Sequence, residues 1–138
     1  MEKQDIQFIK GGDFTDERGK LTFNNFVNLR AKRLYILENS TEVIRAWQGH
    51  RIESRWFTSL HGEFIIKIVK VDDWEKPSIH LDQKVYTLTS GTLDILFVPP
   101  GHATSIQSLT ENGKLLVLSD FSLDEVEDNI KFKPDYWS

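Results

Sequence analysis

The feature that most constrains the fold is the recurrence of short runs rich in β-branched and aromatic residues, with turn residues between them. Such runs are typical of β-strands, because these side chains pack well on a pleated surface. His61-Gly62 predicts a tight hairpin, and Pro99-Pro100-Gly101 predicts a stiff bend. The expected strands span residues 20–26, 32–37, 43–48, 55–60, 63–71, 84–88, 93–98, 103–106 and 114–118.

This succession of short strands indicates an all-β antiparallel sandwich or barrel. Only residues 122–128 predict a helical turn, with Ser122 as its cap and Glu125 three residues later.

Length and composition narrow the class of protein. The 138 residues fit one domain, which we expect to span 1–138. The chain has no cysteine, which excludes disulfides and thiolate metal sites and suits the cytoplasm, where we expect the protein. We expect no membrane partner, because no apolar run resembles a signal peptide or a membrane span. A net charge of −4 without a basic block argues against a nucleic-acid partner.

The densest group of chemically capable side chains lies at residues 44–56, which include two tryptophans, a histidine and several arginines. On a strand Gln48 and His50 point the same way, because side chains alternate with a period of two. The alternative is a surface loop with a solvated histidine.

Other candidates are weaker. Residues 97–104 are better explained as a turn between two core strands, and we interpret His61 and His80 as turn residues. The sequence has no glycine-rich phosphate-binding loop and no serine in a nucleophile elbow.

Several short segments fall in the same order and spacing as in a known family: residues 16–21, 32–35, 45–50, 99–101 and 119–121. With them the sequence resembles the sugar-nucleotide 3,4-ketoisomerases and, more distantly, the dTDP-4-dehydrorhamnose 3,5-epimerases. Both belong to the cupin superfamily, and the resemblance covers about residues 6–136. It implies a single cupin domain, an antiparallel β-barrel or jelly roll also called a double-stranded β-helix.

The resemblance also implies a nucleotide-linked 4-keto-6-deoxy sugar as substrate and an isomerisation by proton transfer next to the ketone, through an enediolate. His50 is then the candidate base or acid, since histidine titrates near neutrality. Gln48 donates hydrogen bonds but carries no proton. Tyr35 is placed to touch the sugar and is the next candidate for catalysis. The expected substrate-binding residues are Arg33 and Arg45 for the diphosphate or oxyanion, Trp47 and Trp56 for stacking or core packing, and Thr104.

Two departures from the family refine this expectation. The ketoisomerases have an arginine followed at +3 and +5 by histidines, where this chain has Arg45, Gln48 and His50. The epimerases use a histidine at the Gln48 position and a late tyrosine, which residues 116–118 lack, so an epimerase mechanism of that kind is not expected. At the metal-ligand positions of cupins stand Gln48, His50, Ser54 and Thr104, of which only His50 is a usual ligand. We therefore expect no metal and no cofactor.

Two alternatives stay open at this point. A non-catalytic cupin that binds a carbohydrate or sugar nucleotide is the first, and a metal-dependent cupin oxygenase is the second. By the same resemblance we expect a homodimer formed through a sheet, with a strand at residues 6–9 crossing to the partner. Deoxysugar and cell-surface polysaccharide biosynthesis are the implied biological setting.

Overall fold

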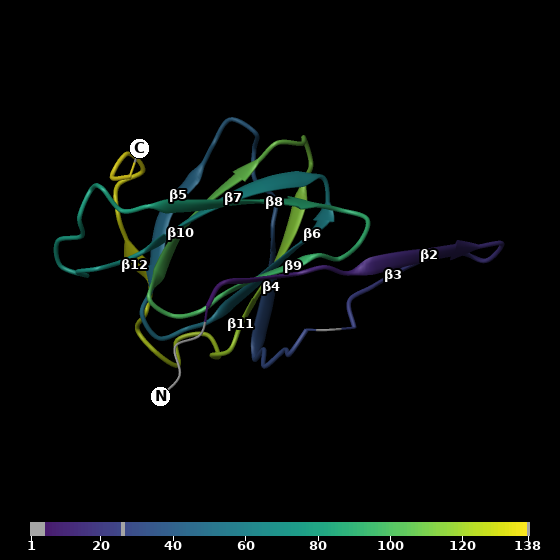
Figure 1. Cartoon of the computed structure of the whole chain (residues 1–138), viewed down its shortest axis with the longest axis horizontal. Helices are drawn as coiled ribbons and strands as arrows, with labels where there is room; N and C mark the ends of the chain where they lie inside the picture. The colour runs from purple at the N-terminus through teal and green to yellow at the C-terminus, as the bar shows by residue number, and fades with distance from the viewer. Residues whose placement is uncertain (1–4, 26, 138) are drawn as a thin grey trace.

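Two five-stranded sheets facing each other make up the body of the molecule (Figure 1), in a computed structural model that describes residues 5–25 and 27–137. The first sheet has the order β1 (Gln7–Ile9), β9 (Ile95–Val98), β6 (Arg55–His61), β11 (Lys114–Ser119) and β4 (Arg33–Leu37). The second has the order β12 (Ile130–Lys131), β5 (Arg45–His50), β10 (His102–Ser108), β7 (Glu63–Lys70) and β8 (Gln83–Thr89). All strand pairs are antiparallel, so the prediction of an all-β jelly roll is confirmed.

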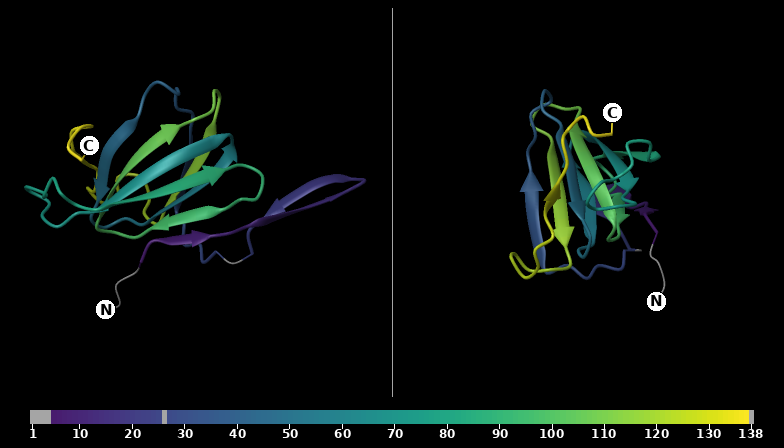
Figure 2. Two further views of the ribbon diagram at one scale, coloured as in Figure 1. Left: turned by 45° about the horizontal axis from the view of Figure 1, so that its top comes forward. Right: turned by 90° about the vertical axis from the view of Figure 1, so that its left-hand side faces the viewer.

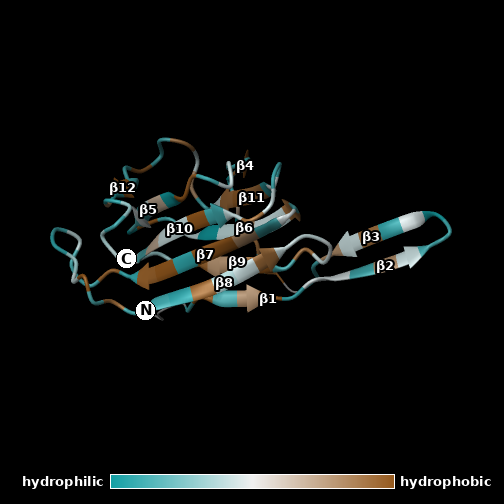
Figure 3. Cartoon of the chain, turned by 90° about the horizontal axis from the view of Figure 1, so that it is seen from above, coloured by the Kyte–Doolittle hydropathy of each residue, from teal (hydrophilic) through white to brown (hydrophobic). Residues whose placement is uncertain are grey.

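The main hydrophobic core fills the space between the sheets. Alternate residues of each strand point inward, and β7 is largely hydrophobic (Figure 3). The buried cluster consists of Phe57, Phe64, Ile66, Ile68, Leu88, Leu96, Val98, Ile106, Leu115 and Val117.

Most expected strands form within a few residues of their predicted bounds, but two further strands were not expected. β12 was not predicted, and neither was β2 (Gly12–Asp16), which pairs with β3 (Gly19–Phe23). Phe26, the expected end of the first strand, lies outside the described residues. The predicted helical turn at 122–128 is wrong. Ser122 and Glu125 do exchange hydrogen bonds, but Asp124 has a φ of 62°, which ends the turn before a helix can propagate.

The hairpin β2–β3 projects away from the two sheets (Figures 2 and 3). β1 pairs with β9 of the same chain at one edge of the first sheet, and its crossing to a partner stays a prediction. Within residues 5–25 and 27–137, no helix is long and apolar enough to cross a membrane.

Candidate functional site

A pocket of about 330 Å³ lies between the two sheets and borders the main core through Phe57 and Ile106. Three of its side chains are cationic, one is a histidine and none is a carboxylate. The lining residues are Tyr35, Leu37, Arg45, Ala46, Trp47, Gln48, His50, Arg55, Phe57, Thr104, Ile106 and Lys131. This lining suits an anionic ligand with a polar end.

Six residues singled out in the sequence line this pocket. They come from β4, β5 and β10, and the register explains why they meet: Thr104 is the cross-strand partner of Gln48. Side chains of such partners lie on the same face of a sheet. The six are Tyr35, Arg45, Trp47, Gln48, His50 and Thr104.

The other two predicted residues do not line the pocket. The guanidinium of Arg33 lies over the Tyr35 ring, 5.7 Å from the centroid of that ring. Of the two roles expected for Trp56, stacking on the ligand or packing in the core, the structure shows core packing. It is 1% exposed and packs with Phe97 and Leu118 on the outer face of the first sheet, because strand alternation turns it away from its neighbour Arg55.

His50 is the last residue of β5 and is 6% exposed. Its Nδ1 lies 2.7 Å from the backbone carbonyl oxygen of Asp128. Because a carbonyl only accepts, Nδ1 carries the hydrogen, and Nε2 of the neutral ring keeps a free lone pair. No described residue forms a hydrogen bond with Nε2. His50 therefore presents an unprotonated Nε2 that can act as a base in the pocket.

Electrostatics also favour the neutral imidazole. Burial lowers the pKa of His50 below its ordinary value, and the positive charge of Arg55 lowers it further. The Asp128 carbonyl and the carboxylates of Glu53 and Asp128 act in the opposite direction but do not prevail. At neutral pH the ring is thus ready to accept a proton.

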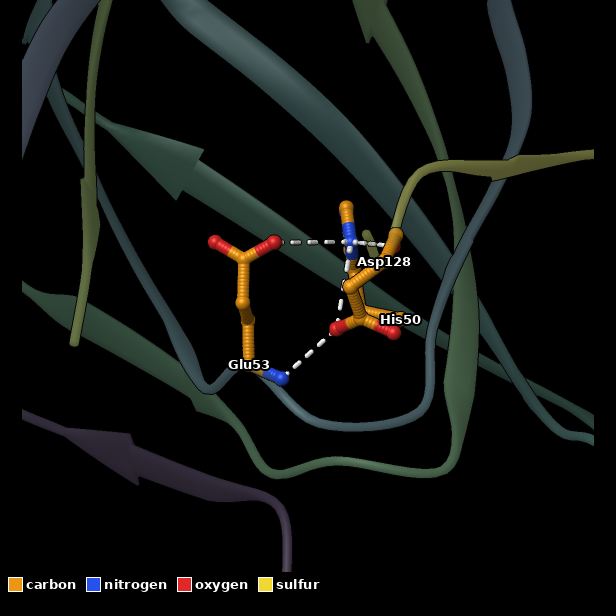
Figure 4. A group of neighbouring side chains, drawn as sticks. All are labelled: His50, Glu53 and Asp128. Carbon is orange, nitrogen blue, oxygen red and sulfur yellow. Dashed lines mark hydrogen bonds and ion pairs between the residues drawn. The ribbon is translucent and has the colours of Figure 1, made fainter. Parts of the chain in front are cut away.

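Asp128 organises the loop that follows β5. Its buried carboxylate accepts hydrogen bonds from the backbone N–H groups of Arg51, Ile52 and Glu53, at 2.6, 2.9 and 2.7 Å. These bonds hold residue 128 against the loop and thereby place its carbonyl on the His50 ring (Figure 4).

His50, Glu53 and Asp128 also form the one group of this kind, among the described residues, whose ligand atoms lie close enough together to suggest a metal (Figure 4). The donors do not fit one. The Nδ1 of His50 carries a hydrogen, and the Asp128 oxygens already accept three N–H groups. Oε1 of Glu53 accepts the Ser119 hydroxyl at 2.5 Å and Arg55 at 3.3 Å. The absence of a functional metal stays a prediction, now supported by these occupied lone pairs.

The C-terminal segment contacts two further pocket residues, Gln48 and Trp47, and contributes a third, Lys131. Gln48 donates a hydrogen bond to Asn129, and Trp47 packs edge-to-face on Trp137 with ring centroids 5.3 Å apart. Lys131, on β12, contributes its side chain to the lining.

Sequence reasoning missed four residues of the site, namely Glu53, Arg55, Asp128 and Lys131. Arg55 had a usable signal, since it alternates with the apolar Phe57 on the inward face of β6. Asp128 and Lys131 had none, because the return of the C-terminal segment along β5 is a tertiary event.

No protein-family model matches the sequence, and no curated protein matches it. Solved structures do match. A variant of the QdtA 3,4-ketoisomerase from Thermoanaerobacterium thermosaccharolyticum, solved in complex with TDP-4-keto-6-deoxyglucose, is 22% identical over 98% of this chain and 93% of its own, with a TM-score of 0.72. The WlaRB TDP-quinovose 3,4-ketoisomerase from Campylobacter jejuni is 16% identical over 98% of both chains, with a TM-score of 0.73.

The dTDP-4-dehydrorhamnose 3,5-epimerase from Bacillus anthracis, with TDP and PPi bound, is 17% identical over 87% of this chain and 75% of its own, with a TM-score of 0.68. At these identities the likeness establishes a shared fold, which confirms the resemblance at that level. The chain has the jelly-roll fold of the sugar-nucleotide 3,4-ketoisomerases and 3,5-epimerases.

Proposed function

We propose that the protein is an isomerase that acts on a nucleotide-linked 4-keto-6-deoxy sugar by proton transfer next to the ketone. The observation that carries this proposal is the state of His50. Its neutral imidazole is fixed as the Nδ1–H tautomer, and its Nε2 has no hydrogen-bond partner among the described residues. The described lining of the pocket holds three cations and no carboxylate, so Nε2 is available as a base.

The chemistry follows from that base. Nε2 of His50 removes the proton from C3 of the sugar, and the electron pair of the broken C–H bond forms the C3–C4 double bond of an enediolate. The negative charge develops on the C4 oxygen, where the pocket offers the cation of Arg55 and the hydroxyl of Tyr35. The hydroxyl proton at C3 passes to the C4 oxygen and His50 returns its proton to C4, which leaves a 3-keto sugar with a hydroxyl at C4. Gln48 and Thr104 orient the sugar by hydrogen bonds.

The charge of the pocket supports a nucleoside diphosphate as the rest of the substrate. Arg45 is anchored by a 2.7 Å hydrogen bond from its Nε to Asn39, and no residue in the described part of the chain accepts a hydrogen bond from its terminal nitrogens. Lys131 belongs to the same lining. Structures of this fold solved with TDP and with TDP-4-keto-6-deoxyglucose support the same assignment.

We further propose a homodimer. β4 is an edge strand whose outward residues Leu34 and Ile36 are 65% and 50% exposed, and Leu116 lies beside Ile36 on the next strand. An apolar sheet face of this kind is suited to a second copy of the chain. A cytoplasmic location and a role in cell-surface polysaccharide biosynthesis are proposals that follow from the activity.

The activity is tested by incubating the protein with TDP- and UDP-4-keto-6-deoxyglucose in heavy water. Deuterium at C3 or C4, with formation of a 3-keto product, is the expected result. Binding of the nucleotide sugar without exchange would favour a non-catalytic binding protein instead.

A further inference from the structure

Arg55 is the most buried cation of the pocket. It begins β6, is 6% exposed, and stands in one row with Ser119 and Arg33 across three neighbouring strands. Its NH1 donates to the Tyr35 hydroxyl at 2.7 Å, and its NH2 to Glu53 Oε1 at 3.3 Å. Its Nε is buried without a partner among the described residues, a cost that a purely structural arginine does not explain.

We propose that Arg55 is a positioning residue that holds the Tyr35 hydroxyl as a proton donor toward the sugar, facing the base His50. This inference rests on the function proposed above. It gives the site a second proton carrier, which Gln48 does not supply.

The direction of the hydrogen bond carries the argument. A guanidinium has only donors, so the Tyr35 oxygen accepts from Arg55 and its own hydrogen points elsewhere. No described residue accepts that hydrogen. Because Tyr35 lines the pocket, its hydrogen can be donated to an oxygen of a bound ligand.

The proton balance closes with these two carriers. As His50 takes the C3 proton, Tyr35 gives its hydrogen to the C4 oxygen, and a neutral enediol forms. The Tyr35 oxygen, facing Arg55, then takes the hydroxyl proton at C3, and His50 returns its proton to C4. Both residues end in their starting state, and no co-reactant is needed.

Arg55 is also electrostatically coupled to the base. Other charged or titratable groups near His50 are Glu53 on the loop after β5, Asp128 on the segment before β12, and His102, its cross-strand partner on β10. Arg45, Lys131 and Tyr35 line the same pocket as His50. The charge of Arg55 lowers the pKa of His50, so removing it raises that pKa. This predicts a change in pH profile that a loss of packing alone would not produce.

The test compares Arg55→Met, Arg55→Lys, Tyr35→Phe and the double variant of Arg55→Met with Tyr35→Phe. Arg18→Met is the matched control, because that guanidinium is exposed on the β2–β3 turn. Arg55→Met should lower kcat by about 10²-fold with a smaller change in KM, and should move the acid limb of kcat/KM to higher pH. Adding Tyr35→Phe should then cost little more, because the two residues act as a unit.

Arg55→Lys keeps the positive charge but loses the planar guanidinium that bonds Tyr35 and Glu53 at the same time. Its kcat should fall about tenfold, with the acid limb of kcat/KM at the wild-type pH. If Arg55→Met does not fold, Arg55→Lys still tests the proposal. An NMR titration of His50 in the free protein measures the Arg55 coupling without turnover. Lack of turnover in the unmodified protein would overturn the proposed function. Wild-type kcat and pH profile in both Arg55 variants, or purely additive effects with Tyr35→Phe, would overturn this inference alone.

Discussion

Replacing Asp128 tests how the site is held together. Its carboxylate accepts three backbone N–H groups of residues 51–53, and hydrogen bonds to a charged group contribute about 1.5–3 kcal/mol each. In Asp128→Ala the N–H groups of the exposed Arg51 and Ile52 regain water, whereas that of the buried Glu53 does not. We therefore expect a loss of about 3–5 kcal/mol in the free energy of unfolding.

Asp128→Asn should lose less, about 2 kcal/mol, because its amide keeps one acceptor oxygen but carries no charge. Glu127→Gln is the matched control, since Glu127 is an exposed neighbour of the same charge, and it should change stability by less than about 0.5 kcal/mol. Urea unfolding followed by tryptophan fluorescence measures these differences.

Catalysis should respond as well. The same three bonds place the Asp128 carbonyl on the His50 ring, so loosening the loop should lower kcat even where the protein is fully folded. If Asp128→Asn and Asp128→Ala both matched Glu127→Gln in stability and kcat, the carboxylate would not hold the loop, and this account of the site would be refuted.

Four further predictions follow from the site and the fold. His50→Asn should keep ligand affinity and lower turnover about 10²–10⁴-fold, while Gln48→His should be neutral or mildly activating; steady-state kinetics and calorimetry measure both. Burial is the main cause that lowers the pKa of both His50 and His102, so the stability they contribute is full above the unfolded pKa of about 6.5 and is lost as pH falls below it toward the folded values. Urea titrations at several pH values should show this slope, and His102→Asn should flatten it. Activity should survive a chelator, and elemental analysis should find no stoichiometric metal; activity restored only by a divalent ion would contradict this. Light scattering at micromolar concentration should show a dimer that Leu34→Arg converts to a monomer, and a wild-type monomer would remove the dimer proposal.

The inner strands were predictable because their signal is local. β6 and β7 alternate or run apolar between clear turns, and the 45–50 segment carries its own cluster of polar and aromatic residues. The same alternation, applied to β6, would have separated Arg55 from Trp56 before the structure was known. Where the sequence offered two readings of a tryptophan, stacking or core, only the packed sheet could decide between them.

The rest depends on contacts that no local pattern encodes. Asp128 lies far along the chain from the loop that it binds, and its role exists only once β12 has paired with β5. Near Ser122, by contrast, the local pattern predicted a helical turn that does not form. The expected hydrogen bond between Ser122 and Glu125 is present, but the positive φ of Asp124 prevents a helix.

Hydrogen exchange with the solvent shows whether His50 moves a proton on the sugar. The protein and its His50→Asn variant are incubated with TDP-4-keto-6-deoxyglucose in heavy water, and the recovered sugar is analysed by NMR. We expect deuterium at C3 or C4 with the wild-type chain and exchange slowed about 10²-fold or more with the variant. Equal exchange by both proteins, or none by the wild type, would contradict it.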